Sequence, residues 1–180
     1  MLIHRDTSAL LIVDIQERLL THIDGWQSVL ENAQWLVRVA QRLGVPVMAS
    51  EQYPKGLGHT HAELKALLPA GAIAEKQHFS CVEAGCLAGL PGDDRRQVVM
   101  AGIESHVCVL QTALELRWQG REVFVVAQAV GSRRHADKEL ALARMRTHSV
   151  EIVSREMVAF EWLGRAGSDE FRTVSAECLR

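Results

Sequence analysis

One cysteine of this 180-residue chain lies where a thiol can serve as a nucleophile. Residues 98–100 are a short apolar run that predicts a buried parallel strand. Gly102 permits a turn after it without a Cβ clash, and Cys108 then falls in the first turn of an expected amphipathic helix. The free N–H groups of a helix N-terminus stabilise a thiolate, so we expect this position to lower the pKa of Cys108. Nucleophilic catalysis is one interpretation of Cys108, and a cysteine that only packs in the core is the other.

Two charged residues end expected strands. Asp14 follows the apolar segment 8–13, and Lys76 ends the segment 72–76. A buried charge is unfavourable unless it is paired or used in chemistry. Asp14 is therefore either a functional carboxylate or a cap or loop residue, and Lys76 is either a functional cation or a lysine that extends to solvent. Because the carboxyl ends of parallel strands meet at one edge of a sheet, we expect Asp14, Lys76 and Cys108 to face one another.

These residues need a scaffold of alternating strands and helices. Short apolar segments predict strands at residues 8–13, 45–49, 72–76, 98–100, 122–127 and 150–153. Helical spacing and capping patterns predict helices at residues 26–43, 61–68, 137–146, 156–163 and 170–178, and another that starts at Ser80 and carries Cys81 and Cys86. Residues 51–58 are expected to form a loop that lines the ligand crevice. The alternation predicts a largely parallel α/β sheet with right-handed crossovers.

Length and composition indicate an ordinary globular protein. The chain is 48% hydrophobic and 23% charged, with a formal net charge of −2, and we expect one domain over residues 1–180. This charge implies no binding to nucleic acid or to an anionic membrane. The apolar segments are shorter than the roughly 20 residues of a spanning helix, and the N-terminus lacks the pattern of a signal peptide. We therefore expect a cytoplasmic protein.

The spacing of the cysteines bears on their redox state. Cys81, Cys86, Cys108 and Cys178 form no C-x-x-C pair. This spacing predicts neither a zinc ribbon nor a thioredoxin-type pair. We expect four reduced, independent thiols.

Three local strings occur together in a pattern that resembles a known superfamily. They are residues 11–16 (Leu-Ile-Val-Asp-Ile-Gln), the pair Glu75-Lys76, and residues 101–109 (Ala-Gly-Ile-Glu-Ser-His-Val-Cys-Val). In order and context they resemble the isochorismatase-like cysteine hydrolases, which include nicotinamidases and N-carbamoylsarcosine amidases. The resemblance covers nearly the whole chain. Residues 51–58 and the segment from Glu156 are most similar to the isochorismatase-domain-containing group.

The resemblance implies a fold and a mechanism. The implied fold has three layers and is doubly wound, with a six-stranded parallel sheet in the order 3-2-1-4-5-6 and helices on both faces. The implied catalytic triad is Asp14 as general base, Lys76 as the cation, and Cys108 as the nucleophile that forms an acyl-enzyme with an amide-like substrate. A non-proline cis peptide is implied between Ile103 and Glu104, and the N–H groups of Glu104 and Cys108 would form the oxyanion hole.

The chain departs from the nicotinamidases at their metal site. Where those enzymes carry an aspartate and histidines after the second strand, this chain has Glu51, with His59 and His61 further along. This spacing does not match the metal motif. We expect no metal and no other cofactor.

The expected ligand is a small molecule. Candidate substrate-binding residues are Gln16, Glu51, Tyr53 and Phe79. The apolar closing helices and the habit of the superfamily together suggest a homodimer or a larger homo-oligomer.

Two other functions stay open. One is the ether-cleaving isochorismatase reaction, but the members that perform it lack the cysteine nucleophile, so Cys108 argues against it. The other is a binding or scaffold protein that keeps the fold and does no chemistry, since a fold does not determine a function.

Overall fold

Six parallel strands form one sheet in the order β3-β2-β1-β4-β5-β6. The computed structural model describes residues 1–178. Its strands are β1 (Ser8–Val13), β2 (Val47–Gln52), β3 (Ile73–Lys76), β4 (Gln97–Ile103), β5 (Glu122–Gly131) and β6 (Glu151–Val153). The predicted sheet and its strand order are confirmed.

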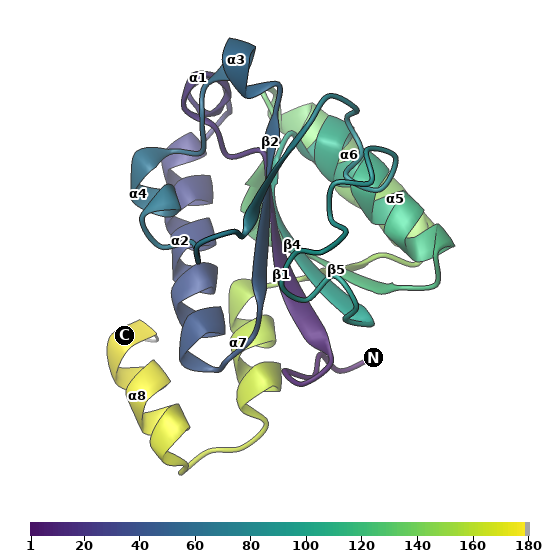
Figure 1. Ribbon diagram of the computed structural model, residues 1–180. Coiled ribbons are helices and arrows are strands. Elements are labelled where there is room, and N and C mark those ends of the chain that lie inside the picture. The colour runs from purple at the N-terminus through teal and green to yellow at the C-terminus, as the bar shows by residue number, and fades with distance from the viewer. Residues whose placement is uncertain (179–180) are drawn as a thin grey trace.

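Helices cover both faces of this sheet (Figure 1). They are α1 (Glu17–Leu20), α2 (Trp26–Arg42), α3 (Pro54–Leu57), α4 (Ala62–Lys65), the π-helix η1 (Ser105–Val109), α5 (Leu110–Trp118), α6 (His135–Thr147), α7 (Arg155–Leu163) and α8 (Asp169–Cys178). Helices α2 and α7 lie on one face, α5 and α6 lie on the other, and α8 packs against α2. The three layers agree with the predicted doubly wound arrangement. No helix within residues 1–178 has the length and apolar character to cross a membrane.

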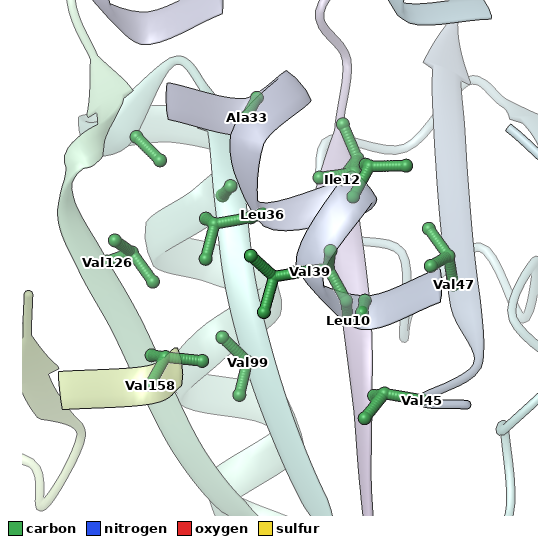
Figure 2. Packing of buried hydrophobic residues seen from close by; sticks show 14 of the residues in the cluster. Leu10, Ile12, Ala33, Leu36, Val39, Val45, Val47, Val99, Val126 and Val158 are labelled. Atoms are coloured by element: carbon green, nitrogen blue, oxygen red, sulfur yellow. The ribbon is translucent and has the colours of Figure 1, made fainter. Parts of the chain in front are cut away.

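The central strands are buried on both faces, which explains their continuous apolar sequences. Leu10 and Ile12 of β1 pack with Leu36 and Val39 of α2 in one core cluster (Figure 2). The alternate residue, Leu11, belongs to a second cluster with residues of α5 and α6. Because both faces are packed, the carboxyl ends of the strands are rigid supports for a site.

The second strand is longer than the sequence predicts. Residues 51 and 52, expected in a loop, continue β2 and pair with Glu75 and Lys76 of β3. The strand begins only after Pro46, which lacks an N–H donor for the ladder. The expected loop is also wrong over residues 54–57, which form the short helix α3. The helix predicted over residues 61–68 is shorter and covers only Ala62–Lys65. The predicted bounds of β1 are exact, and those of the other strands and of the helices outside residues 80–90 differ from the observed bounds by a few residues.

The helix predicted from Ser80 is wrong, because residues 80–90 form bends and turns. The local capping signal is present, since the Oγ atom of Ser80 accepts hydrogen bonds from the N–H groups of Val82 (3.0 Å) and Glu83 (3.4 Å). Gly85 and Gly89, however, both adopt positive φ angles that end helical structure. A cap therefore forms without a helix behind it.

Candidate active site

The strand order brings three chemically capable residues to one edge of the sheet. Asp14 directly follows β1, Lys76 is the last residue of β3, and Cys108 lies in η1 just beyond β4. The Nζ atom of Lys76 donates a hydrogen bond of 2.7 Å to Oδ2 of Asp14. Both side chains are fully buried, so this is an ion pair inside the protein.

Asp14 is held by its backbone and by its carboxylate. Its φ angle of 52° lies in the left-handed region, which non-glycine residues seldom adopt. Its N–H donates to the carbonyl oxygen of Ser50 (3.1 Å), and its Oδ1 atom accepts from Oγ of Ser50 (2.7 Å). A carboxylate has about four acceptor positions, so Asp14 keeps capacity for a further proton donor.

Lys76 is surrounded by oxygen atoms. Its Nζ atom donates to Asp14, to Oε1 of Gln52 (2.7 Å), and to the carbonyl oxygens of Phe79 (3.0 Å) and His78 (3.3 Å). Burial is the strongest influence and acts to lower the pKa of Lys76, but the charge and hydrogen bond of Asp14, together with Cys108 and Cys81, outweigh it and the pKa is raised. Lys76 is therefore a fixed positive charge, and an ammonium with three protons has none left over for a substrate.

Cys108 is 5% exposed and packs with apolar residues of the second core cluster. Burial raises the pKa of its thiol, the Asp14 carboxylate raises it further, and the charge of Lys76 opposes them only in part. The expectation of a lowered pKa is therefore wrong. Cys108 does lie in the first turn of the continuous helical segment that η1 and α5 form, so burial outweighs that favourable position.

Gly102 also differs from its expected role. It lies inside β4 beside Val13 of β1, not in a turn, and has a φ angle of 136°. A Cβ atom at this position would overlap the backbone of Val13. Glycine is thus needed for the close approach of the two strands that lead to Asp14 and to the segment of Cys108.

The chain between β4 and Cys108 is anchored to the segment that follows β5. The peptide bond between Ile103 and Glu104 is cis, at the position that the resemblance implies. The Oε2 atom of Glu104 accepts a hydrogen bond from Nε of Arg133 (2.9 Å). The Nδ1 atom of His106 lies 3.0 Å from Oγ of Ser132, which adds a second link between the two segments.

Gln16 is buried and its side chain is used within the protein. Its Oε1 atom accepts from the N–H of Gln52 (2.7 Å), and its Nε2 atom donates to the carbonyl oxygens of Gln52 (2.9 Å) and Gly58 (2.6 Å). These contacts tie the end of β1 to the end of β2. The geometry supports a structural role for Gln16 in place of the expected contact with substrate.

Glu51 is likewise buried and occupied. One carboxylate oxygen accepts from the N–H (2.7 Å) and Oγ1 (2.8 Å) of Thr60, and the other lies 2.9 Å from Nδ1 of His59. Burial acts to raise the pKa of Glu51, but the hydrogen bonds from Thr60 and His59 outweigh it and lower the pKa. Within residues 1–178, no group of three or more His, Cys, Asp or Glu side chains is placed to hold a metal ion.

Tyr53 and Phe79 are the exposed members of the predicted binding set. Their exposed fractions are 51% and 54%. Tyr53 lines a cavity of about 530 Å³ together with Lys55, Lys76 and His78. Phe79 directs its carbonyl oxygen to Lys76 while its side chain remains exposed. Both aromatic residues therefore lie beside Lys76, and their side chains are exposed to solvent.

Sequence analysis missed Ser50 and Gln52, which contact Asp14 and Lys76 directly. Both are buried polar residues in the second half of β2. The available signal was the change from apolar to polar residues directly after residue 49, at the same sheet edge as Asp14. Treating residues 51–58 as a loop concealed it.

Comparison with known proteins gives a consistent family match. The isochorismatase domain model matches residues 8–157. Isochorismatase domain-containing protein 1 of Salmo salar is 38% identical over 171 residues, which are 93% of this chain and 59% of that protein. The chain thus spans less than two thirds of that relative's length.

Solved structures share the fold over the whole chain. The structure of MAR1 ribonuclease from Caenorhabditis elegans has a TM-score of 0.90 at 32% identity and covers 100% of this chain and 93% of that one. The YcaC gene product of Escherichia coli, described as an octameric hydrolase of unknown specificity, has a TM-score of 0.87 at 21% identity, covering 99% and 91% of the two chains. The second likeness concerns the fold alone.

Proposed function

Because this chain belongs to the isochorismatase family, we propose that it is a cysteine hydrolase that cleaves a C–N bond of a small amide-like molecule through an acyl-enzyme on Cys108. The observation that carries this proposal is the buried ion pair of 2.7 Å between Lys76 and Asp14 at the sheet edge where Cys108 also lies. A buried ion pair is often no more stabilising than apolar packing, so stability alone does not explain why Asp14 and Lys76 are buried together. A catalytic role gives such a reason.

The proposed first step is attack by Sγ of Cys108 on the carbonyl carbon. Asp14 accepts the thiol proton as the S–C bond forms, and the carbonyl π electrons move to the oxygen. The N–H groups of Glu104 and Cys108 stabilise this oxyanion. When the oxyanion collapses, the C–N bond breaks and the leaving nitrogen takes the proton from Asp14.

Water completes the reaction. Asp14 accepts a proton from the water molecule as its oxygen attacks the thioester carbon. The S–C bond then breaks, Asp14 returns the proton to Sγ of Cys108, and the acid product leaves with Cys108 restored as a thiol. The raised pKa of Cys108 fits this scheme, because the thiol then stays neutral until a substrate arrives. Lys76 supplies a fixed charge that offsets Asp14 and does not itself transfer protons.

The proposal extends to substrate size and to assembly. Tyr53 and Phe79, both exposed near Lys76, are the candidate substrate contacts that we retain. A cavity of about 530 Å³ beside Tyr53 suits a small molecule.

We also propose a homo-oligomer, since Trp118 on α5 is 89% exposed and Leu140 on α6 is 69% exposed.

The test is a screen of small primary amides and carbamoyl compounds for released ammonia. A variant carrying Cys108→Ala should lose turnover and keep its thermal unfolding temperature, whereas Cys178→Ala, on the distant helix α8, should keep both. Mass spectrometry of the working enzyme should find an acyl group on Cys108 alone. RNA belongs in the panel because the related nematode protein is called a ribonuclease. Turnover that survives Cys108→Ala would overturn the mechanism, and a folded protein inactive on every compound would favour the scaffold alternative.

A further inference from the structure

The side chain of Gln52 links the ammonium group of Lys76 to the main chain at Gln77. It is 8% exposed and is the last residue of β2, directly beside Lys76 in the register of β2 and β3. Its Oε1 atom accepts a hydrogen bond of 2.7 Å from Nζ of Lys76. Its Nε2 atom donates a hydrogen bond of 2.7 Å to the carbonyl oxygen of Gln77.

These two bonds determine which way the amide points. The carbonyl oxygen of Gln77 can only accept, so the NH₂ end of Gln52 must face it and the oxygen end must face Lys76. The backbone of Gln52 is fixed as well, because its N–H donates to Oε1 of Gln16 (2.7 Å) and its carbonyl oxygen accepts from Nε2 of Gln16 (2.9 Å). Gln52 thus presents a pre-oriented acceptor to the ammonium group.

Lys76 needs such an acceptor because its side chain is long. It starts on β3 and must pass β2 to reach Asp14 at the end of β1. Holding a lysine side chain in one conformation opposes about 1.5–2 kcal/mol of rotamer entropy. A neutral acceptor offsets this cost without competing with Asp14 for the positive charge, which a second carboxylate would do.

We propose that Gln52 is a positioning residue that holds the Lys76 ammonium against Asp14, and that Gln16 in turn holds Gln52. The proposal rests on the role assigned to Lys76 in the proposed function, and Gln52 itself touches no reacting atom. The position of Gln52 affects Cys108 only through the charge of Lys76. If Gln52 releases Lys76, the positive charge moves away from the thiol, and the thiol becomes harder to ionise.

The test measures iodoacetamide labelling of Cys108 against pH, with the modified peptide identified by mass spectrometry. Gln52→Met removes the acceptor at similar volume, and we expect the labelling midpoint to rise by about 0.5–1 pH unit, which is about a three- to tenfold lower rate at a fixed pH. Gln52→Asn, one methylene shorter, cannot bridge Lys76 and Gln77, and we expect it to shift the midpoint in the same direction. This second variant serves if Gln52→Met does not fold.

Gln97 provides a matched control at the opposite end of the sheet. It is 2% exposed and lies at the start of β4. Its Oε1 atom accepts hydrogen bonds from the N–H of His4 and Oγ1 of Thr7, and its Nε2 atom donates to the carbonyl oxygen of Leu2 and to Oε2 of Glu122. Gln97→Met should lower the unfolding temperature as Gln52→Met does and leave the labelling midpoint of Cys108 unchanged. An unchanged midpoint in the Gln52 variants would overturn the proposal, because a purely structural role predicts that result.

A double-mutant cycle tests whether Gln52 acts through Lys76. Lys76→Met should raise the midpoint by more than Gln52→Met does, and adding Gln52→Met to Lys76→Met should cause no further shift. Additive shifts would overturn the proposal. Labelling of Cys108 requires no turnover, so this test is independent of hydrolase activity. If the protein has no hydrolase activity but the shifts in the labelling midpoint are non-additive, only the proposed function is contradicted.

Discussion

At the scale of single residues, hydrogen-bond donors face both oxygens of the buried Asp14 side chain. Oγ of Ser50 donates to Oδ1 and Nζ of Lys76 donates to Oδ2, each at 2.7 Å. The pair is electrically neutral while Cys108 is a thiol, and ionising that thiol would leave one uncompensated negative charge in the interior. The arrangement therefore favours proton transfer during attack over a thiolate formed in advance.

The first prediction concerns the ion pair. Lys76→Met should lower the free energy of unfolding by about 3–5 kcal/mol, because it leaves Asp14 as an unpaired buried charge. Adding Asp14→Asn should recover most of this loss, since the charge is then gone. Chemical denaturation of the parent protein, of Lys76→Met, of Asp14→Asn and of the double variant measures the coupling energy between the two residues. A double variant that is less stable than Lys76→Met would show that the pair contributes little to stability.

The second prediction concerns the pH dependence of Cys108. Burial and Asp14 raise the pKa of this thiol, so its thiolate form is rare at neutral pH and increases only as the pH rises. Iodoacetamide labelling of Cys108 in the native protein should therefore have a midpoint above the value of about 8.5 for a free thiol. Urea-unfolded protein is the control, with a midpoint near that value. A native midpoint below the unfolded one would mean that Lys76 outweighs burial.

At the scale of secondary structure, the distance between β1 and β4 depends on one glycine. Gly102 pairs with Val13, and the two strands carry Asp14 and the segment of Cys108 beyond their ends. No other residue type fits, because a Cβ atom would overlap the Val13 backbone. The site geometry thus depends on a contact between main chains.

The third prediction follows from this contact. Gly102→Ala should lower the free energy of unfolding by about 3–5 kcal/mol, through overlap with β1 and an unfavourable φ angle. The matched control is Gly44→Ala, which also has a positive φ, 71°, but has open space where the Cβ would lie. It should lose about 1–2 kcal/mol. Equal losses in thermal or chemical unfolding would show that the φ angle, and not the close approach, determines the cost.

At the scale of the whole molecule, one helical layer carries large exposed apolar side chains. Trp118 ends α5 and Leu140 lies on α6, and these helices cover the same face of the sheet (Figure 1). Removing such side chains from water on association is favourable by about 1.5–3 kcal/mol each. This layer is the part of the surface that we expect to contribute to assembly.

The fourth prediction is the oligomeric state. Light scattering after size-exclusion chromatography should give a mass at least twice that of one chain. Trp118→Lys should shift the mass toward the single chain, because it replaces an apolar contact by a charge. Phe160→Lys on α7, which is 48% exposed on the other face, is the control and should leave the mass unchanged. A parent protein with the mass of one chain would contradict the proposed assembly.

Much of the fold and of the candidate site follows from the sequence alone. The apolar run of β1 predicts its bounds, and the alternation of apolar segments with helical spacing predicts a parallel sheet. Residue order then assigns Asp14, Lys76 and Cys108 to one sheet edge, because parallel strands all end on the same side. These conclusions depend on local patterns and on topology, which a sequence contains.

Tertiary structure decided the rest. The length of β2, and with it the roles of Ser50 and Gln52, depends on pairing with β3 across a long separation in sequence. The turns at residues 80–90 replace a helix despite a formed cap, because the glycines adopt positive φ angles. The raised pKa of Cys108 depends on how many atoms cover the thiol and on where Asp14 and Lys76 lie. Burial and electrostatics are sums over neighbours in space, and only the folded chain determines those neighbours.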